Sequence, residues 1–274
     1  MTRLLAACSL IAAASALALP ASAQSDADAP TDWELVRMPE KKTLAAVAAF
    51  DNGLGLVARC TDGVYDVMIT GLPEAARRDS SRQLGFRVGD DGELVERAWT
   101  VARERTAAFS RAPAPLVRQL AKGGKLQIVV PGENGGRRTR YVMELGASAA
   151  ALEETLTTCD RPLVDPRDSQ IEGDGRDGLP AGVSWAIAPR PSFPVGVNGQ
   201  SPSEGYVSLT CVTLSDGRLN GCQIEAEQPP GFFLGRSTLR AMDRARVQVS
   251  EEARAAGMTP EGRVILFTVV FKME

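Results

Sequence analysis

Residues 206–225 read YVSLTCVTLSDGRLNGCQIE, and this stretch decides the fold of the last third of the chain. Apolar and polar residues alternate on both sides of Asp216-Gly217, a pair that is typical of a tight hairpin turn. A two-residue turn sets Cys211 opposite Cys222, at a hydrogen-bonded position of the ladder. The stretch therefore predicts a β-hairpin with a disulfide across it.

The hairpin strands, expected over residues 206–214 and 219–225, have one face suited to a hydrophobic core. Side chains alternate between the two faces of a strand, so the residues assigned to the helix-covered face are Val207, Leu209, Cys211, Cys222 and Ile224. Beyond the hairpin, apolar residues recur at helical spacing over residues 237–246, with Ser237 as the expected N-cap. A final apolar run, Val264 to Phe271, has the length of a strand and follows the helix breakers Gly257 and Pro260.

These elements and the Pro191-Ser192-Phe193-Pro194 motif before them resemble the C-terminal domain of TonB-type periplasmic proteins. The resemblance covers about residues 190–274. It implies a small α+β domain with one helix, in which the hairpin and the closing strand form a single antiparallel sheet. It also implies a non-catalytic function, the binding of another protein of the cell envelope.

Energy-transducing members of the TonB family carry a membrane anchor with a functional histidine and a long proline-rich spacer. This chain has no histidine, and residues 161–189 are rich in Asp, Gly and Arg and are expected to be a short interdomain linker. A membrane-anchored energy transducer for outer-membrane transport, with residues 4–19 as its anchor, stays the first alternative.

The first 23 residues have the pattern of a secretory signal peptide: a cationic start with Arg3, an apolar run over residues 4–19 and the small-residue site Ala21-Ser22-Ala23. The apolar run falls short of the roughly 20 residues that span a bilayer. We therefore expect the mature chain to be periplasmic in a Gram-negative bacterium, without stable membrane insertion. Retention as an anchor, or lipidation at Cys8, is the minor alternative.

The four cysteines beyond the signal form an even set, as expected in an oxidising compartment. Besides the bridge between Cys211 and Cys222, a bridge from Cys60 to Cys159 would close a loop of about 100 residues. Neither pair has the Cys-x-x-Cys spacing of a redox site. Both disulfides are therefore predicted to be structural.

The pattern of residues 24–160 predicts a β-rich N-terminal domain. Turn signals separate three pairs of short strands, and two helices are expected over residues 114–122 and 148–157, the second with Ser148 as its N-cap. The block loosely resembles uncharacterised periplasmic proteins with a cysteine in an early strand and another at the end of a closing helix. The whole chain is predicted to be α+β.

Composition argues against several classes of function. Without histidine, Ser-His-Asp catalysis and the commonest zinc ligand are ruled out, and no phosphate-binding or dinucleotide-binding glycine motif occurs. The net charge of −3 argues against nucleic-acid binding. We expect no metal and no cofactor, and a hydrolase that works with two carboxylates stays the second alternative.

Two apolar segments are the candidate partner contacts. Phe232 and Phe233 follow a Pro-Pro pair and are either an exposed anchor or a plug beneath the hairpin. Val264, Leu266 and Val270 belong to the closing strand, which can accept a partner strand if it lies at a sheet edge.

Overall fold

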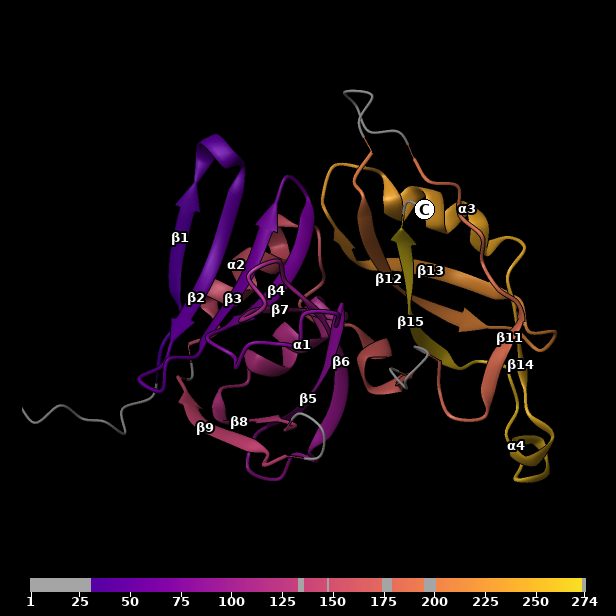
Figure 1. Ribbon diagram of the computed structural model, residues 1–274, viewed down its shortest axis with the longest axis horizontal. Helices are drawn as coiled ribbons and strands as arrows, with labels where there is room; N and C mark the ends of the chain where they lie inside the picture. The colour runs from indigo at the N-terminus through magenta and orange to yellow at the C-terminus, as the bar shows by residue number, and fades with distance from the viewer. Residues whose placement is uncertain (1–30, 133–135, 147, 174–178, 195–200, 273–274) are drawn as a thin grey trace, which may run out of the picture.

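The computed structural model describes residues 31–132, 136–146, 148–173, 179–194 and 201–272 (Figure 1). The predicted signal peptide lies outside these residues. Two regions, each with its own sheet and hydrophobic core, lie side by side: a larger one up to about residue 160 and a smaller one that holds the C-terminal strands. The chain is strand-rich with few helices and its sheets are mainly antiparallel, which confirms the α+β class.

All three hairpins predicted for the N-terminal region are present. Their strands are β3 (Gly55–Thr61) with β4 (Val64–Thr70), β5 (Ser81–Val88) with β6 (Val95–Val101), and β8 (Gly124–Val130) with β9 (Thr139–Leu145).

Three further strands, which the sequence patterns did not reveal, complete the N-terminal sheet. They are β1 (Glu34–Met38), β2 (Thr43–Ala49) and β7 (Ala108–Ser110), with a short 3-10 helix, η1 (Pro39–Lys41), between the first two. The order is β1-β2-β3-β4-β7-β6-β5-β8-β9. The sequence of β2, TLAAVAA, is rich in alanine, a helix former, so pairing with both neighbours overrides its local propensity.

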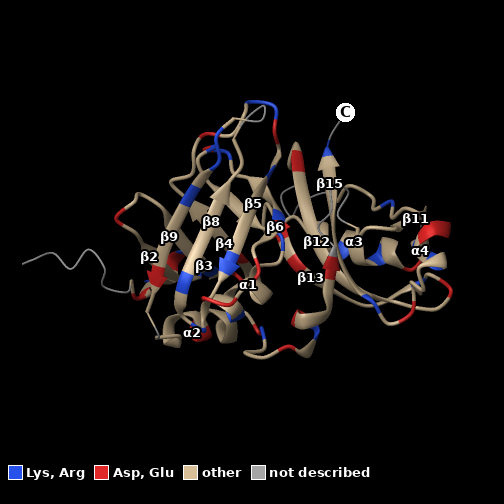
Figure 2. Cartoon of the chain, turned by 90° about the horizontal axis from the view of Figure 1, so that it is seen from below, with Lys and Arg blue, Asp and Glu red and all other residues tan. Residues whose placement is uncertain are grey.

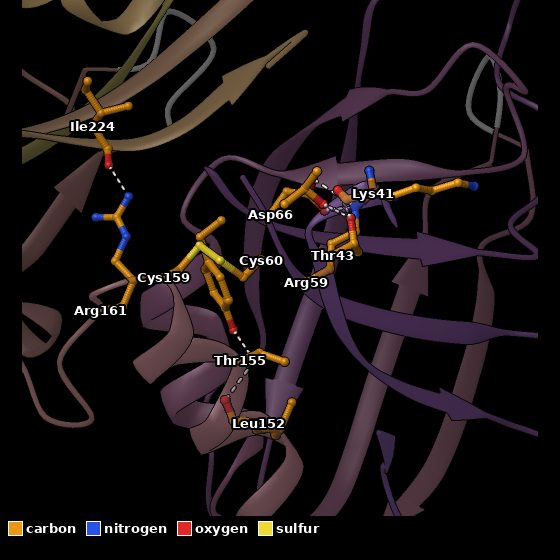
Figure 3. The surroundings of a disulfide bond; sticks show 12 residues. Lys41, Thr43, Arg59, Cys60, Asp66, Leu152, Thr155, Cys159, Arg161 and Ile224 are labelled. Atoms are coloured by element: carbon orange, nitrogen blue, oxygen red, sulfur yellow. Dashed lines mark hydrogen bonds and ion pairs between the residues drawn. A yellow bond between two sulfur atoms is a disulfide. The ribbon is translucent and has the colours of Figure 1, made fainter. Parts of the chain in front are cut away.

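Two helices, α1 (Pro113–Leu120) and α2 (Ala150–Thr158), pack against this sheet near their predicted positions. The Cys60–Cys159 disulfide joins β3 to the end of α2, which confirms that pairing (Figure 3). The prediction for Ser148 is wrong, because α2 begins one residue later, after Ala149, and no side chain caps it.

The predicted linker over residues 161–189 is not a simple spacer. It contains the 3-10 helix η3 (Pro166–Gln170) and two strands, β10 (Ile171–Gly173) and β11 (Val183–Ile187). Its charged residues are largely used in contacts: Arg118 of α1 binds both carboxylate oxygens of Asp168, at 2.5 and 2.7 Å. Asp168, one of the acidic residues that suggested a solvated linker, therefore forms an ion pair with the N-terminal region.

The C-terminal sheet has the order β10-β15-β12-β13, in which β12 (Glu204–Thr213), β13 (Leu219–Gln228) and β15 (Val264–Lys272) are antiparallel and β10 joins in parallel. The predicted hairpin and closing strand are thus confirmed as elements of one sheet. A separate pair, β11 with β14 (Arg246–Val249), and a short helix, α4 (Glu251–Ala255), complete the region.

The hairpin turn differs from the predicted one by a residue. Leu214 N donates to Arg218 O, so three residues, ending in Gly217, form the loop. Gly217 has φ +77°, and a Cβ there would lie 2.1 Å from the carbonyl oxygen of Val247. A bulge near Gly221 of β13 then shifts the pairing by one residue, so that the strands beyond it pair as predicted, with Thr210 opposite Gln223.

This shift places Cys211 at a non-hydrogen-bonded position toward β13, contrary to the prediction, while the disulfide to Cys222 is kept. The Cα–Cα distance of 4.1 Å is typical of such a position. The face assigned to the core is confirmed: Val207, Leu209 and Cys211 are buried in the C-terminal core, and Cys222 and Ile224 pack at its margin.

The main C-terminal helix, α3 (Leu234–Met242), begins three residues before its predicted start. Ser237 is therefore not its N-cap, and its hydroxyl donates instead to the carbonyl oxygen of Ser192. The first two backbone N–H groups of the helix, at Leu234 and Gly235, donate to the carboxylate of Glu227 at 3.0 and 3.1 Å. A carboxylate from the neighbouring strand thus takes the place of the predicted serine cap.

Candidate functional site

The five predicted partner contacts differ greatly in exposure. Val264 and Leu266 are only 2% and 1% exposed, and Phe232 packs against the C-terminal core. Phe233 is 42% exposed and Val270 is 55% exposed. Only the last two therefore have side chains that a partner could contact.

Phe233 and Val270 lie on opposite faces of the C-terminal sheet. Phe233 immediately precedes α3, and the guanidinium of Arg236 lies 5.3 Å from its ring centre. The neighbours of Val270, Val269 and Phe271, pack on the α3 side, so Val270 points to the other face. The structure does not join the two predicted contacts into one surface.

The backbone of β15 offers a different kind of contact. Because Leu214 N donates to Arg218 O, even-numbered residues of β12 direct their backbone groups toward β13, and odd-numbered ones toward β15. On β15, the residues that pair with these odd-numbered residues are Ile265, Phe267, Val269 and Phe271. The N–H and C=O groups of Thr268 and Val270 consequently point away from β12.

The outer side of β15 is covered over only part of its length. The parallel strand β10 pairs with residues 264–266. From Phe267 to Lys272, no strand among the described residues pairs with this side. This segment, which we call the open edge of β15, presents the unpaired polar groups of a strand edge.

The other margin of the sheet, β13, faces the N-terminal region. Arg161 donates to the carbonyl oxygen of Ile224 at 2.6 Å (Figure 3), and Arg167 donates to the side chain of Gln223. Residues of β4 and α1 also lie against β13. Of the two margins, the open edge of β15 is therefore the more accessible to a partner strand.

A buried polar contact fixes the sheet against the N-terminal region. Asp66 of β4 accepts hydrogen bonds from Arg59, at 2.8 and 3.0 Å, and from Gln228 at the end of β13, at 3.1 Å. Burial raises the pKa of the Asp66 carboxyl, although Arg59 and Gln228 both favour its ionised form. The contact joins the two regions through a carboxylate that is almost inaccessible to water.

A second contact of this kind involves Glu225, which bulges from β13. Its carboxylate accepts a hydrogen bond from Thr210 at 2.5 Å and lies 4.0 Å from Arg167. Arg167 in turn pairs with Asp165, and its donated hydrogen bond lowers the pKa of that carboxyl. Residues of the supposed linker thus help to hold the sheet in place.

Two clefts bear on the hydrolase alternative. One, of about 290 Å³, lies between β6, α1 and Leu266, with Trp99 at its floor and Glu93 as its one carboxylate. The other, of about 660 Å³, lies beside α3 and has Asp243 as its one carboxylate. Neither of these two clefts has the pair of carboxylates that glycosidase-type hydrolysis requires.

Within the described part of the chain, no helix is long and apolar enough to span a membrane, and no group of three or more His, Cys, Asp or Glu side chains could hold a metal ion. No protein-family model matches the chain, and a search of curated proteins also found no match. The resemblance to the TonB C-terminal domain therefore stays a prediction that rests on the order of elements.

Proposed function

We propose that this chain is a non-catalytic binding module of the bacterial periplasm and that it docks an extended segment of a cell-envelope protein on the open edge of β15. The observation that carries this proposal is the outward direction of the backbone groups of Thr268 and Val270, next to residues that no described strand covers. An added strand would gain main-chain hydrogen bonds from these groups.

The sequence and the disulfides support the location and the class of function. Two structural disulfides are expected of a protein folded in an oxidising compartment. The resemblance to the TonB C-terminal domain favours a protein partner. Neither of the two clefts described above offers a pair of carboxylates, so the hydrolase alternative gains no support from them.

The test uses the complete mature chain, because residues before the C-terminal domain help to build its sheet. Strand β10 pairs with β15, and Arg167 of η3 contacts β13. A photo-cross-linking residue replaces Lys272, at the end of the open edge, and the protein is irradiated in the native cell envelope. The control carries the same residue at Val142 of β9, which is likewise an exposed position on a marginal strand. We expect a discrete adduct with an envelope protein from position 272 and none of that mass from position 142.

A backbone variant distinguishes edge pairing from side-chain contact. Val270→Pro removes an outward N–H, and proline is tolerated where a strand N–H has no partner. We expect Val270→Pro to abolish the adduct and Val270→Ala, which keeps the N–H, to retain it. Equal yields from both variants would show that the partner does not add a strand to β15.

A further inference from the structure

The arginines of the C-terminal region fall into two groups. Four make hydrogen bonds or ion pairs within the protein: Arg218, Arg246, Arg254 and Arg263. Four others have no such bond to any described residue, apart from the ring contact of Arg236, and all four are exposed: Arg190, Arg236, Arg240 and Arg244. Three of these four lie on α3 or within two residues of its end, and the ribbon of Figure 2 has blue segments there.

Arg236 and Arg240 lie on α3, and Arg244 lies two residues beyond the end of the helix. Arg236 and Arg240 are four residues apart, so they are like-charged neighbours on the helix surface, and Arg244 continues this row in the turn that follows. Arg236 also lies in the first turn, where the helix dipole disfavours a positive charge, and the carboxylate bound at that end, Glu227, comes from β13 rather than from the turn itself. Of the arginines on α3, only Arg240, in the last turn, lies where the helix dipole favours a positive charge.

The row borders a groove. Residues 186–192 run alongside α3, and the space between them measures about 660 Å³. Arg190 and Ser192 line one wall, and Ser237, Arg240 and Arg244 line the other. We call this the arginine groove, and its one acidic lining residue is Asp243.

We propose that the arginine groove binds an extended acidic segment of a partner protein. Arg236 and Arg240, four residues apart on α3, are separated by about 6 Å along its axis. Side chains on one face of an extended strand recur every 6.6 to 6.8 Å or so. Carboxylates at alternate positions of an extended peptide therefore match the row, and each can accept paired hydrogen bonds from a guanidinium.

The geometry favours a peptide over an anionic membrane surface. The basic residues line the two walls of a concavity, which admits a strand, whereas a lipid surface needs a convex or flat face that reaches all headgroups at once. This inference does not depend on docking at the open edge of β15.

The test is fluorescence anisotropy of the mature protein with a labelled peptide of about eight residues that carries Asp at alternate positions. The variant is Arg240→Glu/Arg244→Glu, and the matched control is Arg77→Glu/Arg78→Glu, which makes the same change of charge at two exposed arginines of the N-terminal region. We expect the first to weaken binding about tenfold or more and the second to change it less than about twofold. Circular dichroism checks that both variants fold.

Three results would overturn the proposal. The first is no binding of the alternating peptide at low salt. The second is equal weakening by both double variants, which would mean that only net charge matters. The third is tighter binding of vesicles containing phosphatidylglycerol than of the peptide, with the same sensitivity to Arg240→Glu/Arg244→Glu. Val270→Pro should leave peptide binding unchanged, so a failure at the β15 edge is distinguishable from a failure here.

Discussion

The side-chain amide of Gln228 donates to the carboxylate of Asp66, with 3.1 Å between Nε2 and Oδ2. Gln228 is the last residue of β13, and Asp66 lies in the middle of β4, so this one bond links two strands from different sheets. Arg59 completes the site from β3. The bond helps to hold β13 against the N-terminal region, on the opposite margin of the sheet from the open edge of β15.

Replacing Asp66 should destabilise the protein through this contact. Asp66→Ala leaves Gln228 without its acceptor and Arg59, whose side chain is 31% exposed, without its carboxylate. We expect a loss of about 1–3 kcal/mol in the free energy of unfolding, measured with urea. The control is Glu154→Ala in α2, which removes an exposed pair with Arg37 and should cost less than about 1 kcal/mol. Equal losses would show that the Asp66 site contributes no more than a surface pair.

The raised pKa of Asp66 predicts a pH dependence of definite sign. Its folded pKa lies above the ordinary value of 3.8, so the folded protein binds this proton more tightly than the unfolded chain does. The resulting stabilisation is fully present below pH 3.8 and is lost as the pH rises through the folded pKa. The stability of Asp66→Asn relative to wild type should therefore rise with pH over this window.

Asp165 provides the comparison of opposite sign. Its pKa is lowered, chiefly by the hydrogen bond from Arg167, so its contribution is present above pH 3.8 and is lost as the pH falls through the folded pKa. The stability of Asp165→Asn relative to wild type should therefore fall as the pH rises. Urea unfolding at a series of pH values measures both trends, and trends of the same sign would contradict the assigned environments.

The two disulfides should differ in their contribution to stability. The bridge from Cys60 to Cys159 spans 99 residues and that from Cys211 to Cys222 spans 11. Loop-closure entropy gives about 5 kcal/mol for the first and about 3 kcal/mol for the second. Double serine variants, compared by urea unfolding, should show the larger loss for Cys60→Ser/Cys159→Ser. The reverse order would mean that the disulfides do not stabilise the protein mainly by restricting the unfolded chain.

Glu227 should be needed for the start of α3. Glu227→Ala removes the acceptor of the N–H groups of Leu234 and Gly235, and we expect it to cost about 0.5–2 kcal/mol of unfolding free energy. Glu227→Gln keeps one acceptor oxygen and should cost less. The matched control is Glu204→Ala at the start of β12, an exposed carboxylate in the same sheet. A loss no larger than that of the control would exclude the capping role.

Local sequence signals were sufficient to place some strands and helices but not others. Turn residues and period-two alternation were enough to place four hairpins, and an apolar run after two helix breakers was enough to place β15, because local chemistry determines these elements. They were not enough for β10 and β11, whose segment reads as polar linker and becomes ordered only through contacts with β15, β14 and Arg118. The start of α3 was missed because its cap, Glu227, comes from a neighbouring strand rather than from the residue before the helix.

The candidate contacts show the same limit. The strand over Val264 to Phe271 was correctly predicted, but not that Val264 and Leu266 would be buried, since that depends on how the two regions pack. The row of Arg236, Arg240 and Arg244 was readable from the sequence by its spacing of four. Its lack of internal partners was not, because only the structure shows which arginines are bonded.

Amide hydrogen exchange of the free mature protein, resolved by residue with NMR, tests the open edge of β15 most directly. The account predicts that the amides of Thr268 and Val270 exchange fast, while those of Phe267 and Val269, bonded to β12, exchange slowly. Addition of the cross-linked partner should then slow Thr268 and Val270 selectively. Slow exchange of Thr268 and Val270 in the free protein would mean that the edge is already covered, and would contradict strand docking on β15.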